Sequence, residues 1–323
     1  MDAPMPAAAA APMTAPALVI DDFMPVEVAK AMRADIEAHF ADPAHHRPEI
    51  HQAWNYWFVP GLYTYLKTQP EKVIQRVRVE EFVGRLQRCS TEHLGMGSVT
   101  WPFLSLYVNG CSQGLHNDSK NGRFGYVYSL TSPERRTIGG ETLLLKEGDL
   151  ARRNARATNA GAGLYDLIEP RFNRLVLFDD RLVHGVQRVA GPINRLDGRC
   201  VMHGHIDERG PIVLGALSIE AVHDGISAAI QRFATEKTTS IASYHGPIVF
   251  RFTTAADGRV SGLRVLLDRV FDELSNDARC EVAKINLAEA LAQSLFPAAA
   301  GEATVTLPVT FGGPVGRRND EGP

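Results

Sequence analysis

Residues 99–108 read VTWPFLSLYV, and this stretch does most to predict the fold of the chain. Its last six side chains alternate between two faces, as successive side chains of a β-strand do. Several short apolar runs follow at similar intervals, separated by Gly, Asn or Asp: 126–130, 142–145, 175–178 and 200–206. Regular short strands with turns between them favour a β-sandwich or barrel over a parallel sheet.

Helices are predicted before this β-rich stretch. A strand at 18–20 precedes Pro25, which suits the first turn of a helix, where its missing N–H is not needed. Apolar side chains recur every fourth residue from Val28 to Phe40 and predict one apolar helix face. A second helix is predicted over 71–88, after the aromatic-rich segment 54–65.

The pattern changes again after Gly210 and Pro211. Residues 216–236 are typical of a helix and 238–244 of a linker. Two strand-like runs, 248–253 and 260–266, flank Asp257-Gly258, which is a strong hairpin signal. A helix over 279–295 and a strand over 304–311 complete a small α+β set. We therefore expect a disordered tail at 1–16, a main domain at 17–210, a helical linker at 211–245, a small α+β domain at 246–312 and a disordered tail at 313–323.

The composition restricts the function classes. The chain has 323 residues, 45% of them hydrophobic and 22% charged, which is ordinary for a soluble globular protein. A formal net charge of −3 without basic clusters argues against nucleic-acid binding, and no stretch is apolar for long enough to predict a membrane span. The four scattered cysteines predict free thiols in a reducing compartment, and the N-terminus lacks the features of a signal peptide. A cytoplasmic location is expected.

Two histidines and a carboxylate have the spacing of an iron site. His116 and Asp118 are two residues apart at the end of a predicted strand, so both side chains can point to the same side. His184 follows the apolar run LVLFDDRLV and can return a third ligand from a distant strand. Such a triad leaves three positions of an octahedral Fe(II) open for a cosubstrate and O2. A single His-x-Asp pair also occurs by chance. The order of the remaining motifs therefore decides whether this pair is interpreted as a metal site.

That order resembles the prolyl-4-hydroxylase-like branch of the 2-oxoglutarate/Fe(II)-dependent dioxygenases. The chain has the family's motifs in the family's order: Tyr107, His116-Asn117-Asp118, Arg123, Gly139-Gly140-Glu141-Thr142, Leu175–Phe178, His184-Gly185-Val186 and Gly198-Arg199. The segment ALVIDDFMP with the helix after it also looks like the family's entry segment, so the resemblance covers about residues 17–208.

The resemblance implies a mainly β fold, a double-stranded β-helix (jelly roll) flanked by the N-terminal helices. It implies Fe(II) as cofactor on His116, Asp118 and His184, with 2-oxoglutarate and O2 as cosubstrates. Arg199 matches the arginine that binds the distal carboxylate of 2-oxoglutarate, as a guanidinium fork would. Tyr107 matches a tyrosine that often contacts the cosubstrate, although core packing is equally open to it.

Three details of the match leave alternatives open. Arg188 and Arg195 compete with Arg199, because the spacing after the last histidine varies in the family. The family often has Ser or Thr two residues after this arginine; here Val201 occupies the position, so a second anchor for the carboxylate must come from elsewhere. Halogenating relatives carry Gly or Ala in place of Asp118, so the carboxylate favours hydroxylation.

Other residues are weaker candidates. His203 and His205 could form a second metal site, but no third ligand is visible nearby. A hydrogen-bonded structural role is the preferred interpretation, and contact with substrate or with the metal ligands is the alternative. Trp54 and Tyr128 are further candidates for contact with substrate or with the metal ligands. The histidines His45, His46 and His51 are interpreted as solvated loop residues.

The C-terminal stretch 246–311 resembles a TonB-type module, with GPIVFRFTTAADGRVSGLRV, a helix ending in LFP and the strand GEATVTLPVTF. That resemblance implies a protein or peptide partner. The leading hypothesis for the chain is a hydroxylase of an unactivated C–H in a peptide or protein side chain. The alternatives are hydroxylation of a free amino acid or other small metabolite, and an inactive metal-binding recognition scaffold.

Overall fold

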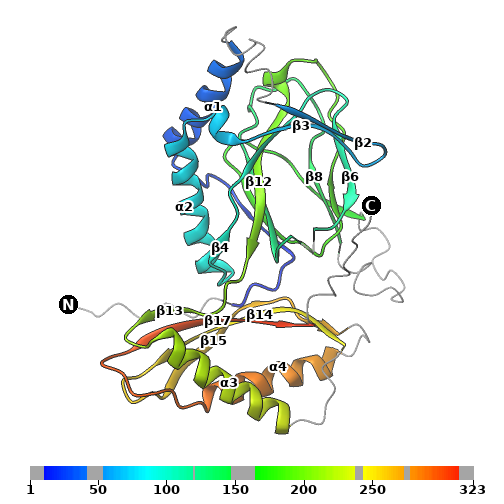
Figure 1. Cartoon of the computed structure of the whole chain (residues 1–323). Helices are drawn as coiled ribbons and strands as arrows, with labels where there is room; N and C mark the ends of the chain where they lie inside the picture. The colour runs from blue at the N-terminus through cyan, green and yellow to red at the C-terminus, as the bar shows by residue number, and fades with distance from the viewer. Residues whose placement is uncertain are drawn as a thin grey trace, which may run out of the picture. The chain divides into compact units, whose positions relative to one another are not determined.

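A computed structural model of the chain describes residues 11–41, 54–118, 121–146, 164–236, 243–272 and 277–312 (Figure 1). The chain divides into two compact units. The larger unit comprises 16–89 and 98–207, and the smaller unit comprises 1–15, 90–97 and 208–323. Each unit is described by itself.

The larger unit is an antiparallel sheet that curls back on itself. Its strands pair in the order β1 (Ala17–Ile20), β10 (Leu175–Asp179), β7 (Phe124–Ser129), β12 (Arg199–Asp207), β5 (Phe103–Tyr107), β3 (Tyr63–Thr68), β6 (Ser112–His116), β11 (His184–Val186), β8 (Thr142–Leu145) and β9 (Tyr165–Ile168). Two shorter partners lie off this path: β2 (Asn55–Val59) pairs with β3, and β4 (Ser98–Val99) pairs with β12.

The curl occurs at β3. One end of this strand pairs with β5 around Lys67, and its other end pairs with β6 around Tyr63. A single strand thereby joins the two halves of the sheet, whose inner faces turn toward each other. The predicted fold class, a mainly β double-stranded β-helix, is confirmed.

Two helices of the larger unit, α1 (Val26–Ala41) and α2 (Arg76–His93), lie together on one side of the sheet (Figure 1). On α1, Met32 and Ile36 are fully buried, as the four-residue period predicted. On α2, Phe82 is fully buried, and its ring centroid lies 4.8 Å from that of Tyr128 on β7. The helices therefore cover the outer face of β7, and the inner face is free to line a cavity.

The second helix begins later than predicted. Residues Pro70–Lys72 form a short 3-10 helix, and α2 starts at Arg76 rather than at 71. The Asp35 carboxylate of α1 accepts a hydrogen bond from the Gln75 backbone N–H, at 3.0 Å, directly before the helix. A carboxylate at the start of a helix satisfies a backbone N–H that has no partner within the helix and complements the helix dipole. Periodicity alone could not locate this contact between distant segments.

The smaller unit contains one antiparallel sheet with two helices on one face (Figure 1). Its elements are β13 (Ile212–Gly215), α3 (Ile219–Glu236), β14 (Tyr244–Thr254), β15 (Val260–Asp268), β16 (Phe271–Asp272), α4 (Asp277–Ala292) and β17 (Ala303–Phe311). The strand order is β13-β17-β14-β15, and β16 pairs with β14. Val222 and Phe233 of α3 share one buried core with Phe250 of β14 and Leu291 of α4.

Two expected boundaries need correction. The stretch 211–245 is not a linker, because β13 pairs with β17 and α3 contributes to the core of the smaller unit. The N-terminal tail does not extend to residue 16. Met13 donates a hydrogen bond from its N–H to Leu266 O (2.8 Å) and accepts one from the Asp268 N–H (3.0 Å), both on β15. The unpaired backbone N–H and C=O groups of a sheet edge can bind an extended segment in this way, whatever side chains that segment carries.

Several predictions lie outside the described residues: those on His45, His46 and His51, on residues 237–242 of the linker and on most of both tails. The described parts of the chain contain no disulfide; Cys111, Cys200 and Cys280 are buried free thiols, and Cys89 is half-buried. Among the helices in these ranges, none has the length and apolarity that crossing a bilayer requires.

Candidate metal centre

The inside of the β-helix holds a cavity of about 620 Å³. Its volume is within the range of about 300–1,000 Å³ that small-molecule sites occupy. Both halves of the sheet line it, including His116, Asp118 and His184 at one place and Tyr107 and Arg199 at another. Residues that belong to separate motifs in the sequence therefore line the same cavity.

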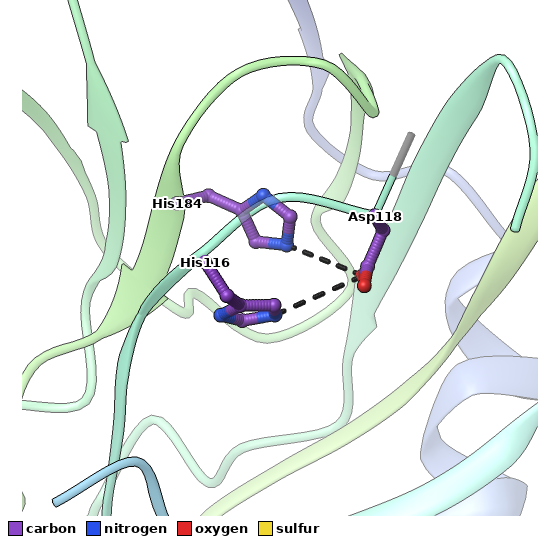
Figure 2. Close-up of side chains that lie close together, drawn as sticks. All are labelled: His116, Asp118 and His184. Atoms are coloured by element: carbon purple, nitrogen blue, oxygen red, sulfur yellow. Dashed lines mark ion pairs between the residues drawn. The ribbon is translucent and has the colours of Figure 1, made fainter. Parts of the chain in front are cut away.

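Strand pairing brings the three candidate metal ligands together. His184, the first residue of β11, pairs directly with His116, the last residue of β6. Asp118 follows two residues later, and Figure 2 shows its carboxylate facing both imidazoles. Its Oδ2 lies 3.4 Å from Nε2 of His184 and 3.8 Å from Nε2 of His116.

The three ligand atoms lie within 4.8 Å of one another. Neighbouring ligands of an octahedral ion at about 2.1 Å are about 3 Å apart, so a small inward movement would close the triad on a metal. The backbone fixes both rings: Nδ1 of His116 lies 2.8 Å from Gly114 O, and Nδ1 of His184 lies 2.9 Å from Leu182 O. Each Nδ1 then carries the proton, which leaves the Nε2 lone pairs for a metal. The donor set fits Fe(II).

The protonation states also suit a metal. Burial and the neighbouring His184 ring lower the pKa of His116, which keeps its imidazole neutral. Burial alone would raise the pKa of Asp118, but its contacts with the imidazoles of His184 and His116 leave it below its usual range. A carboxylate and a neutral imidazole are the forms that ligate a metal.

Asp180 contacts both Asp118 and His205. Its backbone carbonyl accepts a hydrogen bond from the Asp118 N–H (2.9 Å), and its Oδ2 lies 2.9 Å from Nδ1 of His205. Its other carboxylate oxygen, Oδ1, is buried and has no hydrogen-bond partner. Burial, partly offset by the bond with His205, raises the pKa of Asp180 to about 6. A Cβ on Gly125 would lie 2.7 Å from this Oδ1, so the close approach requires glycine there.

Arg199 and Tyr107 form a different part of the cavity. They pair directly between β12 and β5, and the guanidinium carbon of Arg199 lies 4.8 Å from the centroid of the Tyr107 ring. Arg199 is 2% exposed, and its Nη2 donates to Thr142 Oγ1 at 3.2 Å, while its Nε has no hydrogen-bond partner within the described residues. A buried guanidinium with unsatisfied N–H groups is prepared to bind an anion.

The glycine of the GGET turn makes room for this arginine. Gly140 has φ +79°, and a Cβ there would lie 3.2 Å from both Cβ and Cδ of Arg199. Thr142 of the same turn supplies the hydroxyl that Val201 does not. The sequence contained the motif but gave no sign that its threonine faces Arg199, because that depends on the pairing of β8 with β11.

The competing arginines lie elsewhere. Arg195 is exposed and donates to Phe40 O at the end of α1 (3.0 Å), and Arg188 is also exposed. Neither lines the cavity.

The weaker candidates divide into two groups. His203 and His205 line the cavity; Nε2 of His203 lies 2.7 Å from Ser105 Oγ, and burial together with Lys67 and Arg199 lowers the pKa of His203 to about 3. Trp54 and Tyr128 do not line it. Trp54 donates to His39 Nε2 of α1 (3.0 Å). The Tyr128 hydroxyl, on the outer face of β7, donates to Asn173 Oδ1 (2.8 Å).

Several lining residues were not among the predicted site residues, including Lys67, Gln113, Thr142 and Gly125. Gln113 accepts a hydrogen bond from the Tyr107 hydroxyl (3.0 Å), and its Nε2 lies 3.2 Å from Nε2 of His116. It thus connects the two ends of the site. Its place on β6, three residues before His116, was the available signal.

Comparison with known proteins gives resemblances in structure only. No protein-family model matches the chain, and no curated protein matches it. Among solved structures, a prolyl-4-hydroxylase from Pseudomonas putida is 15% identical with a TM-score of 0.42, over 60% of this chain and 92% of that one. A prolyl hydroxylase from Trichoplax adhaerens, solved with a hypoxia inducible factor peptide fragment, is 13% identical with a TM-score of 0.39, over 58% and 81%. A viral collagen prolyl hydroxylase from Paramecium bursaria Chlorella virus-1, solved with 2-oxoglutarate, is 12% identical with a TM-score of 0.35, over 58% and 94%.

Proposed function

We propose that the chain is an Fe(II)- and 2-oxoglutarate-dependent oxygenase that uses O2 to hydroxylate an unactivated C–H and releases succinate and CO2. One observation carries the proposal: the His116, Asp118 and His184 triad lines the same cavity as the buried guanidinium of Arg199, whose Nε has no hydrogen-bond partner among the described residues. A metal site alone has many uses. A metal site together with a cation for a second carboxylate suits a dicarboxylate cosubstrate.

Each residue of the site then has a role. His116, Asp118 and His184 occupy one face of the metal and leave three positions for other ligands. Fe(II), when bound, supplies the site at which O2 is activated. Arg199 binds the distal carboxylate of 2-oxoglutarate, with Thr142 beside it as the second polar group. The ring of Tyr107 packs over the guanidinium and shields it from water, which strengthens the ion pair.

Asp118 favours hydroxylation over halogenation, because its carboxylate fills the position that a halide would need. Its place is fixed by the bond from its N–H to Asp180 O (2.9 Å). The substrate that we propose is a peptide or protein side chain, with a free amino acid or other small metabolite as the alternative. The smaller unit is proposed as a module that binds a protein or peptide partner. Within the described residues, the two groups of possible metal ligands, His116-Asp118-His184 and Asp118-Asp180-His205, both lie in the larger unit.

The test is succinate release by the full chain with Fe(II), 2-oxoglutarate and O2, compared with the His184→Ala variant and with metal-free protein. We expect succinate only from the metal-loaded wild type, at a slow uncoupled rate before a substrate is found. Iron and 2-oxoglutarate binding are measured separately on the same samples. Stoichiometric binding of both without any succinate would favour the inactive recognition scaffold, and failure to bind iron would refute the proposal.

A further inference from the structure

A lysine enters the cavity where neither the metal nor the cosubstrate needs it. Lys67 lies on β3 and lines the cavity with its side chain half-buried. Its Nζ lies 3.5 Å from the ring centroid of Phe103 and 4.2 Å from that of Trp57. Two aromatic rings thus hold the ammonium group in place.

The ammonium group has no ionic partner in the described parts of the chain, where it makes neither a hydrogen bond nor an ion pair. Burial lowers the pKa of Lys67, and the charge of Asp118 only partly opposes this. Placing a cation in such a position is unfavourable unless an anion or solvent satisfies it. Aromatic faces compensate in part, but they do not replace hydrogen-bond acceptors.

The charges of the loaded site show what is missing. The inference rests on the proposed function at this point. The two positive charges of Fe(II) and that of Arg199 are balanced by Asp118 and by the two carboxylates of 2-oxoglutarate. Lys67 is outside this balance: its ammonium group lies over two aromatic rings and forms no ion pair with a carboxylate of the described residues.

Lys67 and Arg199 contact different places along β5. Arg199 pairs with Tyr107 and its guanidinium lies over that ring, whereas the ammonium group of Lys67 lies over the ring of Phe103. Phe103 and Tyr107 are four residues apart on one strand, which is about 13 Å at the rise of a β-strand. Binding of 2-oxoglutarate to a Lys67 variant therefore tests whether the lysine serves the cosubstrate.

We propose that Lys67 binds a carboxylate of the substrate, and that the substrate class is therefore an acid. The carboxylate can belong to a small organic acid such as an amino acid derivative, or to an acidic residue of a peptide. In both cases it lies against Trp57 and Phe103, whose rings provide an apolar surface for the carbon chain next to it. The same surface favours an acid with an aliphatic or aromatic body over a fully hydrated anion.

The experiment compares acids with neutral counterparts of nearly the same shape. The full chain is loaded with Fe(II) and 2-oxoglutarate without O2, and ligand binding is measured by calorimetry. The first pair of probes is N-acetyl-leucine and its amide; the second is a blocked pentapeptide with a central glutamate and the same peptide with glutamine. Both pairs are titrated into wild type, Lys67→Met, Lys67→Arg and Lys72→Met, the last removing an exposed lysine outside the cavity.

We expect the acid of at least one pair to bind wild type at least about tenfold more tightly than its neutral counterpart. This preference should disappear in Lys67→Met and persist in Lys67→Arg and Lys72→Met. The pair that shows it identifies the source, a small acid or a peptide. Absence of an acid preference in both pairs, or its persistence in Lys67→Met, overturns the proposal.

Binding of 2-oxoglutarate to the same proteins separates this inference from the proposed function. Lys67→Met should bind 2-oxoglutarate as wild type does, which also shows that the variant is folded. If its affinity for 2-oxoglutarate falls instead, Lys67 serves the cosubstrate and the inference is wrong while the proposed function stands. If wild type binds no 2-oxoglutarate, the proposed function fails, and the charge argument for Lys67 fails with it.

Discussion

Replacing Arg199 by methionine tests the cosubstrate site most directly. Arg199 is almost fully buried; its guanidinium donates a hydrogen bond to Thr142 and lies over the Tyr107 ring, and no carboxylate of the described residues forms an ion pair with it. Methionine keeps much of the stem volume and is flexible enough to fill the space. The substitution therefore removes the charge with little change in packing.

The expected loss of affinity follows from the burial. Removing one partner of a buried, hydrogen-bonded charge pair costs about 2–5 kcal/mol, much of it from the charge left unpaired. This corresponds to a fall in 2-oxoglutarate affinity of about 30-fold to several thousand-fold. Iron binding should not change, because Arg199 makes no contact with the metal ligands.

Stability without cosubstrate should change in the opposite direction. Burial lowers the pKa of Arg199, so the folded protein holds this charge at a cost. Replacing a buried charge by an apolar side chain of similar volume is often neutral or stabilising. We expect Arg199→Met to unfold at the same temperature as wild type or higher when no 2-oxoglutarate is present.

The assay measures both properties. Calorimetric titration of 2-oxoglutarate into Fe(II)-loaded protein without O2 gives the affinity. Thermal unfolding with 2-oxoglutarate at about 100 times the wild-type Kd should show a stabilisation of about 2.7 kcal/mol in wild type, or roughly 5–10 °C in Tm, and almost none in the variant.

Arg195→Met is the matched control, since Arg195 is exposed outside the cavity. Unchanged 2-oxoglutarate affinity in Arg199→Met, or a comparable loss in Arg195→Met, would refute the assignment of the distal carboxylate to Arg199.

Three further predictions concern the surroundings of the metal. His184→Ala should lose most Fe(II), measured as iron per chain after gel filtration, and wild-type iron content would remove this residue from the site. Gly140→Ala and Gly61→Ala both place a side chain at positive φ, at a cost of about 1–3 kcal/mol in the free energy of unfolding; only Gly140→Ala should weaken 2-oxoglutarate, because nothing lies within 4 Å of a Cβ at Gly61. Asp180→Asn should remove a pH dependence of the free energy of unfolding. Because folding raises the pKa of Asp180 from 3.8 to about 6, the folded state binds more protons at this residue than the unfolded state. Its contribution to stability therefore falls as pH rises from about 4 to 6, by at most about 1.4 kcal/mol per pH unit. Denaturant unfolding of metal-free protein across this range should show the difference, and parallel curves for wild type and variant would contradict it.

The sequence predicted the β-helix because its strands carry their pattern locally. Alternation from Phe103 to Tyr107 divides the side chains of one strand between two faces and does not depend on the partner strand, although both faces of this strand are largely buried. The helix periodicities identified α1 and α4 within a few residues for the same reason. The hairpin of β2 and β3 was missed, since its aromatic run also suits a core segment, and β2 is exposed along its whole length.

The smaller unit shows where local pattern stops being sufficient. Residues 216–236 were correctly predicted as helical, but their assignment to a linker was wrong. The helix period marks an apolar face without naming the surface that covers it. In the structure Val222 and Phe233 are covered by the core shared with β14 and α4.

By itself, the sequence identified the candidate ligands of the proposed metal centre. His116 and Asp118 are two residues apart on an extended segment, so their common direction is a local property of the backbone, and His184 and Arg199 each follow or begin a strand that is apolar enough to recognise. Tertiary structure alone decided that Lys67, Gln113 and Thr142 belong to the same cavity. Their positions depend on which strands pair and in which register, and a shift of one residue would turn each of these side chains to the opposite face of the sheet.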